Sequence, residues 1–430
     1  MNQQLLSQSH SSIVKSLQAS AEADPFVYGV SESSVNLSKS VVQVDPVRAP
    51  SGGTAQDVQF NLPRNGFLSK CILKVDIESD NFPGNDSAKN SWTARCVREV
   101  SLRARGVELR KANTNSFIAN AIDNENNTVQ SHSRKLIGLH AREGGPSATR
   151  EFQLDIGEVL GFSCNERNRA LQNAIDTLFC EDLTVNVSLG ALADYFFDID
   201  APNNQKYLDA QLICQYQQMT SADYDSFKSK NYSSAEPTRR LIRYHEAEQP
   251  QHKGSDATTD VKVDIRYKGL VRKINVHWWA NAPKAMANVG GQSSTINRIQ
   301  LYGSGSLLWE CDGDVNKLFI NPSLVVPSST SNGMDPGMVD GEANNEFGMQ
   351  VIDFSNVSAN KDKSSFINGC LNTGDLTNVY LVLTRTETPV NGGEGEPQMK
   401  DASQVDVDLE VYAMESIEGS SGLVSVSSKE

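Results

Sequence analysis

The sequence has no long apolar stretch and no closely paired cysteines, and these absences limit what the chain can be. No segment is long and apolar enough to span a bilayer as a helix, and the amino terminus lacks the basic and apolar regions of a signal peptide. The seven cysteines are scattered, odd in number and never spaced as C-x-x-C. We therefore expect reduced thiols and synthesis in the cytoplasm.

Positive charge is also scarce, with a formal net charge of -14. Proteins that grip phosphate backbones usually carry an excess of lysine and arginine. The first 52 residues hold three basic and four acidic side chains, whereas arms that package genomes are blocks of basic residues. We therefore expect no specific nucleic-acid binding.

Catalytic and metal-binding motifs are missing as well. "CDGDVN" opens like a calcium loop with Asp312, Asp314 and Asn316, but Lys317 stands where glycine is required and Ser323 where glutamate is required. The histidines form no H-x-x-x-H or Cys/His group; they are His10, His132, His140, His245, His252 and His277. We predict no catalytic residues, no cofactor-binding residues, no metal site and no cofactor, and hence no enzyme.

Two other motifs have ordinary structural interpretations. "GSGS", Gly303 to Ser306, lacks the third glycine and the helix of a dinucleotide site, so it predicts a hairpin turn. The basic run Arg239, Arg240 and Arg243 could touch lipid phosphates or a minor partner protein, but a solvated connector is the simpler interpretation.

The sequence does contain a duplication. "GFLSKCILKV", residues 66–75, aligns without a gap with "GLVRKINVHW", residues 269–278, and in both copies apolar residues alternate with polar ones as in half-buried strands. Three further strand pairs repeat at an offset of about 200 residues. They are "REVSLRARG" with "NRIQLYGSG", "LTVNVSL" with "VYLVLT", and "LDAQLICQY" with "VDVDLEVYA", the last pairing Leu208, Ala210, Leu212 and Cys214 with Val405, Val407, Leu409 and Val411.

This period is far too long for a solenoid and indicates two similar domains. The pattern predicts an all-β chain with an amino-terminal arm (1–55), a first β domain (56–222), a polar connector (223–257), a second β domain (258–416) and a carboxy-terminal tail (417–430). Helical spacing predicts a short helix in the arm, with Leu6, Ile13 and Leu17 on one face, and another over "NRALQNAIDTLF", residues 168–179.

Two long segments rich in Gly, Asn, Ser and Asp interrupt the domains. Val326 to Gly348, and to a lesser degree Asn113 to Arg134, hold too few large apolar residues to offset the entropy of ordering. We expect both to be mobile and to lie on the outer surface. Leu68, Ile72 and Val271 are apolar residues on otherwise polar strand faces, which suggests that another copy of the chain covers them.

Three segments resemble the double jelly-roll major capsid proteins of adenovirus-like viruses, tailless membrane-containing phages and nucleocytoplasmic large DNA viruses. "FNLPRNGFLSKCILKVDI" is similar to the family's opening strand, "SSFINGCLNTGDLTNVYLVLT" to the segment before its penultimate strand, and "VDVDLEVYAMES" to its closing strand. The resemblance implies two tandem eight-stranded jelly-roll β-sandwiches, each built from two four-stranded sheets, with a short helical amino-terminal arm.

The resemblance also implies a role and partners. Three chains, with two rolls each, would form a pseudo-hexagonal homotrimeric capsomer of an icosahedral shell. The partners would be neighbouring capsomers, penton and minor capsid proteins, and an internal membrane beneath the arm. The protein would reside in the virion.

Two other classes stay open from the sequence. A two-domain carbohydrate-binding or glycan-processing β-sandwich protein would share the architecture, but such proteins normally use exposed aromatic residues, and aromatics make up 7% of this chain. A minor capsid or spike protein shares the roll but usually not the duplication.

Overall fold

A computed structural model describes residues 38–81, 96–113, 116–117, 146–162, 174–192, 206–232, 236–249, 251–252, 260–279, 296–312, 349–354, 369–385, 404–419 and 421–427. The helix predicted at Leu6 to Leu17 lies outside these ranges. Within them, no helix has the length and hydrophobicity to cross a bilayer.

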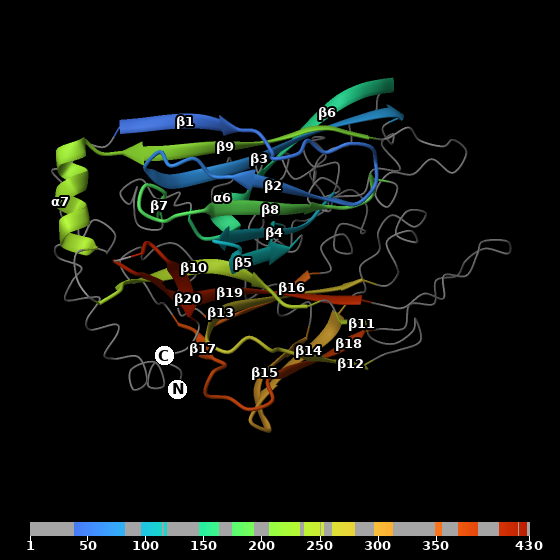
Figure 1. Ribbon diagram of the computed structural model, residues 1–430. Coiled ribbons are helices and arrows are strands. Elements are labelled where there is room, and N and C mark those ends of the chain that lie inside the picture. The colour runs from blue at the N-terminus through green and yellow to red at the C-terminus, as the bar shows by residue number, and fades with distance from the viewer. Residues whose placement is uncertain are drawn as a thin grey trace, which may run out of the picture.

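The first half of the chain folds into two antiparallel sheets (Figure 1). One has the strand order β1-β9-β3-β6 and the other β2-β8-β4-β5. The strands are β1 (Ser38–Val44), β2 (Gln56–Asn61), β3 (Phe67–Asn81), β4 (Val97–Ala104), β5 (Val107–Asn113), β6 (Pro146–Asp155), β8 (Leu183–Leu189) and β9 (Lys206–Gln218). Strand β7 (Ile175–Asp176) pairs with β3, and the short helix α6 (Ile156–Val159) follows β6.

The second half repeats this arrangement. Its sheets have the orders β10-β19-β13-β16 and β12-β18-β14-β15. The strands are β10 (Thr238–Ala247), β12 (Asp260–Asp264), β13 (Leu270–Trp279), β14 (Ile296–Gly303), β15 (Ser306–Asp312), β16 (Met349–Asp353), β18 (Tyr380–Arg385) and β19 (Gln404–Ile417). Three short strands extend the first of these sheets: β11 (Gln251–His252), β17 (Leu371–Asn372) and β20 (Val424–Ser427).

Both halves are therefore jelly rolls, which confirms the predicted fold. With the eight main strands of each half numbered along the chain, one sheet reads 1-8-3-6 and the other 2-7-4-5 in both halves. This is the order that two nested Greek keys produce. We call residues 38–218 roll 1 and residues 238–427 roll 2.

Each roll encloses its own apolar core between its two sheets. Phe60, Phe67 and Leu73 are fully buried in roll 1, and Ile274 and Leu381 in roll 2. Burying one such side chain stabilises a fold by about 1.5–3 kcal/mol. The division is incomplete, because three residues of roll 2 belong to the core of roll 1: Val351 of β16, Ile417 of β19 and Val424 of β20.

The duplicated strand repeats an irregularity as well as a sequence. The register of β3 against β9 shifts between Leu68 and Lys70, and that of β13 against β19 shifts between Val271 and Lys273. A β-bulge interrupts the alternation of faces. Leu68 and Val271 are consequently fully buried inside their own rolls, so the prediction that another copy covers them is wrong. Ile72, beyond the bulge, is half-buried.

The start of each duplicated strand is held by the same hydrogen bonds. Thr177 donates its backbone N–H (3.0 Å) and its hydroxyl (2.7 Å) to the carbonyl oxygen of Gly66. Thr373 likewise donates its backbone N–H (2.8 Å) and its hydroxyl (3.0 Å) to the carbonyl oxygen of Gly269. Both threonines are buried. The duplication thus extends to side-chain contacts that the sequence comparison did not reveal.

The hairpin turns correspond too. Arg105 and Gly106 join β4 to β5, and Ser304 and Gly305 join β14 to β15; all four have positive φ. Two successive positive φ values are the geometry of a type I′ turn, which suits the twist of the flanking strands. The prediction of a hairpin turn at Gly303 to Ser306 is confirmed.

The register corrects one predicted strand match. Cys71 pairs with Cys214 in roll 1, and Ile274, which corresponds to Cys71, pairs with Leu409 in roll 2. Cys214 therefore corresponds to Leu409, two residues from the predicted Val411. Because side chains alternate with a period of two, the slip left the predicted faces intact.

The predicted helix over residues 168–179 is wrong in its described part. Ile175 and Asp176 form β7, which pairs with Leu68 and Phe67 of β3, and a turn follows. Asp176 is buried and its carboxylate accepts hydrogen bonds from the backbone N–H groups of Leu178 and Phe179. An aspartate that binds the next N–H groups favours a turn over a helix.

The predicted domain boundaries stay predictions, but regular elements lie at three of them. Strand β1 begins at Ser38, inside the stretch predicted as arm, and pairs with β9. The helix α7 (Ser221–Asn231) and β10 occupy much of the predicted connector, and β20 lies in the predicted tail. Polar composition suggested linkers here because edge strands and surface helices expose half of their residues.

The two segments predicted to be mobile lie almost wholly outside the described residues. In the segment Asn113 to Arg134, Ser116 and Phe117 are described and are buried, so the expected outer-surface position is wrong for these two residues.

Candidate functional site: the interface between the rolls

The two rolls meet where β5 of roll 1 lies beside β10 and β20 of roll 2 (Figure 1). The helix α6 also contacts β10. Gly161, just after α6, has φ +73°, and a Cβ atom there would overlap the carbonyl oxygen of Arg243. The two backbones touch at this point, so only glycine fits.

A buried carboxylate joins the rolls. Glu415 of β19 forms ion pairs with Arg110 of β5 and Arg240 of β10, one oxygen to each guanidinium. Arg110 also donates to the carbonyl oxygen of Leu160 at 2.7 Å, and Arg240 to that of Ala174. Both arginines therefore bind backbone of roll 1 and the same glutamate of roll 2.

Burial shifts the pKa values in the triad formed by Glu415, Arg110 and Arg240. Loss of water opposes ionisation of Glu415, but the guanidinium groups of Arg240 and Arg110 outweigh that penalty and lower the pKa of the carboxyl. Burial also lowers the pKa of Arg110, although Glu415 opposes the shift. Removing one partner of such a buried pair usually costs about 3–5 kcal/mol, because a charge stays buried without compensation.

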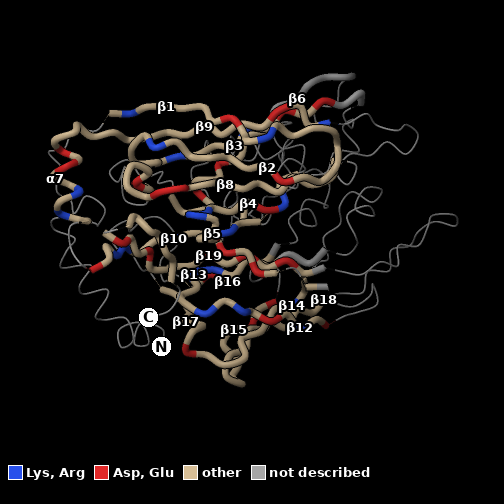
Figure 2. The backbone as a smooth tube through the Cα atoms, in the orientation of Figure 1, with Lys and Arg blue, Asp and Glu red and all other residues tan. Residues whose placement is uncertain are grey.

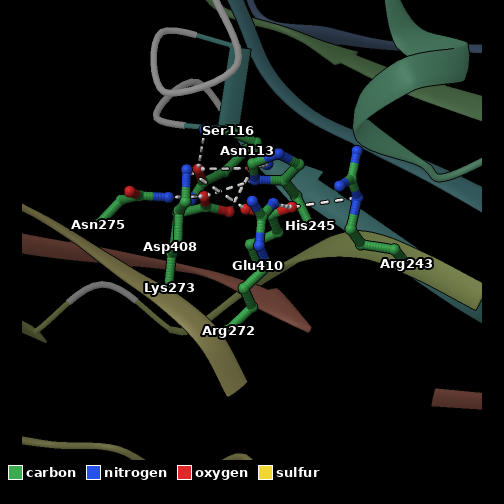
Figure 3. Close-up of polar contacts among 9 residues, drawn as sticks. All are labelled: Asn113, Ser116, Arg243, His245, Arg272, Lys273, Asn275, Asp408 and Glu410. Carbon is green, nitrogen blue, oxygen red and sulfur yellow. Dashed lines mark hydrogen bonds and ion pairs between the residues drawn. The ribbon is translucent and has the colours of Figure 1, made fainter. Parts of the chain in front are cut away.

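A second buried carboxylate lies further along β19 (Figure 3). Asp408 accepts a hydrogen bond from the Ser116 hydroxyl of roll 1 at 2.6 Å and from the Asn275 amide at 2.8 Å. Its Oδ2 atom also lies 2.8 Å from Nδ1 of His245. Burial opposes protonation of His245, but the charge of Asp408 outweighs it and raises the pKa of the imidazole.

Serine, histidine and aspartate thus lie together, but not in the order that nucleophilic catalysis needs. In a hydrolase triad the serine hydroxyl binds the histidine, which in turn binds the aspartate. Here the hydroxyl of Ser116 and the ring of His245 both bind Asp408. The Ser116 proton is committed to the carboxylate, so this group of residues is suited to holding two chain segments together.

The third carboxylate binds cations of roll 2. Glu410 lies 2.5 Å from Nη1 of Arg272, 3.1 Å from Nε of Arg243 and 4.0 Å from Nζ of Lys273 (Figure 3). Burial opposes ionisation of Glu410, but Arg272, Arg243 and Lys273 together lower the pKa of its carboxyl strongly. Lys273 also pairs with Asp353 at 3.5 Å.

One alternating strand places these groups. In β19, Val407, Leu409 and Val411 are buried in the core of roll 2. Asp408 and Glu410 point to the opposite face, as successive residues of a strand must. We call the buried ionic and polar contacts of Glu415, Asp408 and Glu410 the charged interface. Figure 2 shows acidic and basic positions along β5, β19 and β13 where the rolls meet.

Neither a protein-family model nor a curated protein matches the sequence. Solved structures do match the fold. A chain of the PBCV-1 virus capsid is similar with a TM-score of 0.62 and 14% identity, over 94% of this chain and 99% of that one. The Faustovirus major capsid protein has a TM-score of 0.56 and 10% identity, over 96% and 98%. For the STIV major capsid protein the values are 0.51 and 9%, over 88% and 96%.

The chain has the double jelly-roll fold of viral major capsid proteins. The match covers nearly the full length of each capsid protein, so both rolls and their connection are shared. Within this double jelly roll, two contacts of the charged interface join the rolls: Glu415 with Arg110, and Asp408 with Ser116.

Sequence reasoning missed this interface. The run Arg239, Arg240 and Arg243, interpreted as a solvated connector, belongs to β10, and Arg240 is buried against Glu415. Asp408 and Glu410 looked like the solvent side of an alternating strand. One signal was present: Asp406, Asp408 and Glu410 alternate with valine and leucine, whereas the matching strand of roll 1 has the uncharged Gln211, Ile213 and Gln215.

Proposed function

We propose that the protein is a major capsid protein and that three copies form a pseudo-hexagonal capsomer of an icosahedral shell. The proposal rests on how closely the two rolls repeat each other in structure. Two rolls with the same strand order, the same bulge and the same threonine-to-glycine hydrogen bonds are joined in one chain. A chain with two nearly equivalent rolls supplies six similar wedges when three copies combine.

The charged interface supports a mechanical role. A tile must transmit load between its wedges, and buried ion pairs that require one geometry hold the two rolls in one orientation. The structural similarity to chains of the PBCV-1 capsid and to the Faustovirus major capsid protein points to the same role. In this proposal the partners are neighbouring capsomers, penton and minor capsid proteins, and a membrane beneath the amino-terminal segment; the protein resides in the virion and has no enzymatic activity.

The experiment that tests the proposal is a mass measurement by light scattering at micromolar concentration. Three chains of 47.0 kDa give about 141 kDa, and negative-stain images should show tiles of hexagonal outline. A protein that stays at 47.0 kDa at every concentration, with bilobed images, would overturn it.

A further inference from the structure

Two cysteine side chains lie in contact in the interior of roll 1. Cys71 of β3 pairs with Cys214 of β9 in the register of the sheet, and their sulfur atoms are 3.7 Å apart. Both side chains are fully buried in the core of this roll. Among the cysteines that the structure describes, no other two have their sulfur atoms in contact. Residues that are far apart in the sequence thus place two thiols side by side.

The second roll has no such pair. Ile274 and Leu409 occupy the places of Cys71 and Cys214, and they too are paired in register and fully buried. Because both rolls have the same strand order, an aliphatic pair satisfies the packing at this position of the fold. The two cysteines of roll 1 add a property that packing does not require, the ability to form a covalent bond with each other.

The position of the two thiols suits a disulfide bond. Residues directly opposite in antiparallel strands have Cα atoms about 4.5–5.5 Å apart, and a disulfide spans Cα separations of about 4.4–6.8 Å. The sulfur atoms have to approach from 3.7 Å to about 2.05 Å. Rotation about the side-chain bonds can provide this movement, so the strands can keep their register.

Burial determines when the bond can form. The thiolate is the nucleophile in disulfide exchange, and burial, with a smaller contribution from Cys214, raises the pKa of the Cys71 thiol well above its ordinary value. Strand β9 lies between β1 and β3, and β3 lies between β9 and β6 (Figure 1), so the pair is inside the sheet and not at its edge. The folded roll therefore protects both thiols, and an oxidant reaches them only while β3 and β9 are apart.

We propose that Cys71 and Cys214 form a latent disulfide site, which a small disulfide such as oxidised glutathione closes when roll 1 folds or reopens outside a reducing environment. One cysteine thiolate attacks a sulfur atom of the oxidant, whose S–S bond breaks and releases one glutathione. The second cysteine attacks the mixed disulfide, the bond between Cys71 and Cys214 forms, and the second glutathione leaves. The protein loses two electrons and two protons, and the oxidant gains both. This inference goes beyond the capsid role and does not depend on it.

The bond would close most of roll 1 into one loop. Cys71 and Cys214 are 143 positions apart, and β4, β5, β6 and β8 lie between them along the chain. A cross-link stabilises a protein mainly by restricting the unfolded chain, and the effect grows with the length of the closed loop. The oxidised protein should therefore resist unfolding more than the reduced protein does.

Refolding in the presence of the oxidant tests the site. The reduced full-length protein is unfolded in guanidinium chloride and refolded with either reduced or oxidised glutathione. Free thiols are then alkylated, and the digested peptides are analysed by mass spectrometry. We expect a cross-link between the peptides of Cys71 and Cys214 only after refolding with oxidised glutathione. A reduced protein that is kept folded should form the same link much more slowly, and urea below the unfolding midpoint should accelerate the reaction.

Aliphatic variants assign the effect to this pair. Oxidised refolding should raise the melting temperature of the wild type by about 5 °C or more. Cys71→Val and Cys214→Val should lose both the cross-link and this rise, and they keep an apolar core because roll 2 has aliphatic residues at both positions. Cys96→Val is the control and should retain both, since Cys96 is also buried but its thiol has Tyr207 as its neighbour. Circular dichroism checks that each variant is folded.

Three results would overturn the inference. The first is absence of the link both from the refolded protein and from the folded protein treated with oxidised glutathione in urea. The second is a link that lowers the melting temperature, because the bond would then not fit the folded roll. The third is a rise in melting temperature that persists in C71V and C214V, which would assign it to other cysteines. None of these results bears on the capsomer, which the mass measurement by light scattering tests separately.

Discussion

Glu415 of β19 and Arg110 of β5 form an ion pair across the two rolls, with side chains that are 1% and 0% exposed. Their positions are 305 residues apart in the sequence. The pair is completed by Arg240, so one carboxylate compensates two buried guanidinium groups.

Glu415→Gln should destabilise the protein by about 3–5 kcal/mol, because two buried arginines lose their counter-charge. Chemical denaturation followed by circular dichroism measures the loss. Glu181→Gln is the control: Glu181 pairs with Arg105 at 2.7 Å, but both side chains are more than a third exposed, so its loss should cost at most about 1 kcal/mol. Equal losses for the two variants would contradict a structural role for the buried triad.

The buried carboxylates predict loss of stability in acid. Arginine neighbours lower the pKa of Glu415 and Glu410 below the ordinary value of 4.5 in the folded state, so protons bind the unfolded chain more tightly. The stabilisation is present above pH 4.5 and is lost as the pH falls through the folded pKa. The free energy of unfolding should therefore fall steeply below pH 4.5, and E415Q should flatten that slope.

The raised pKa of Glu246 predicts the opposite trend, a free energy of unfolding that falls as the pH rises from 4.5 to about 8. Burial, with smaller contributions from Glu108, Glu248 and Asp408, raises the pKa of its carboxyl to about 8. The folded state then holds a proton that the unfolded state releases above pH 4.5, so the stability contributed by protonated Glu246 falls as the pH rises to about 8. Glu246→Gln should match the wild type in stability at pH 4 and exceed it at pH 9. A constant difference across this range would contradict the assignment.

Gly161→Ala should damage the junction of the rolls. The added Cβ would overlap the carbonyl oxygen of Arg243, and φ is +73°. Gly106→Ala is the control, because Gly106 has φ +80° and open space around its Cβ position. We expect the control to cost about 1 kcal/mol from backbone strain alone and G161A to cost clearly more in thermal unfolding. Equal costs would mean that the rolls separate easily at α6.

Thr177→Val and Thr373→Val should have similar effects, since each removes a buried hydroxyl that donates to the glycine before a duplicated strand. The expected cost is about 1–3 kcal/mol each. Differential scanning calorimetry should show one transition in both variants, because the charged interface couples the rolls. Two separated transitions, one per roll, would contradict that coupling.

Several features of the fold could be predicted from the sequence, and the reasons are physical. Alternation of apolar residues marks a strand wherever one face is buried, so the duplicated strands were readable. A bulge changes which face of a strand is buried without changing the composition of the strand. The burial of Leu68 and Val271 therefore could not be predicted from the sequence. Residues 168–179 have helical spacing, but in the described part the hydrogen bonds that Asp176 accepts from the backbone and the pairing with β3 outweigh a weak local preference.

The charged interface was hidden for a different reason. A carboxylate on the polar side of a strand looks the same whether water or a second domain covers it. Asp408 is fully buried with Ser116 of roll 1 against it, and Arg240 is buried between Glu415 and the backbone of roll 1. Both facts depend on contacts between segments more than 150 residues apart, which local patterns do not encode.

The way in which the two rolls share their cores has a consequence for the order of synthesis. Ile417 and Val424, from the carboxy-terminal segment, complete the core of roll 1, and Ser421 accepts a hydrogen bond from Arg105 at 3.0 Å. Domains generally fold as units while the ribosome is still translating. Here the amino-terminal half lacks part of its interior until the segment around Val424 has emerged. A chain truncated before Val424 is therefore left with an incomplete core in its first roll, so the carboxy-terminal segment decides when the amino-terminal half can finish folding.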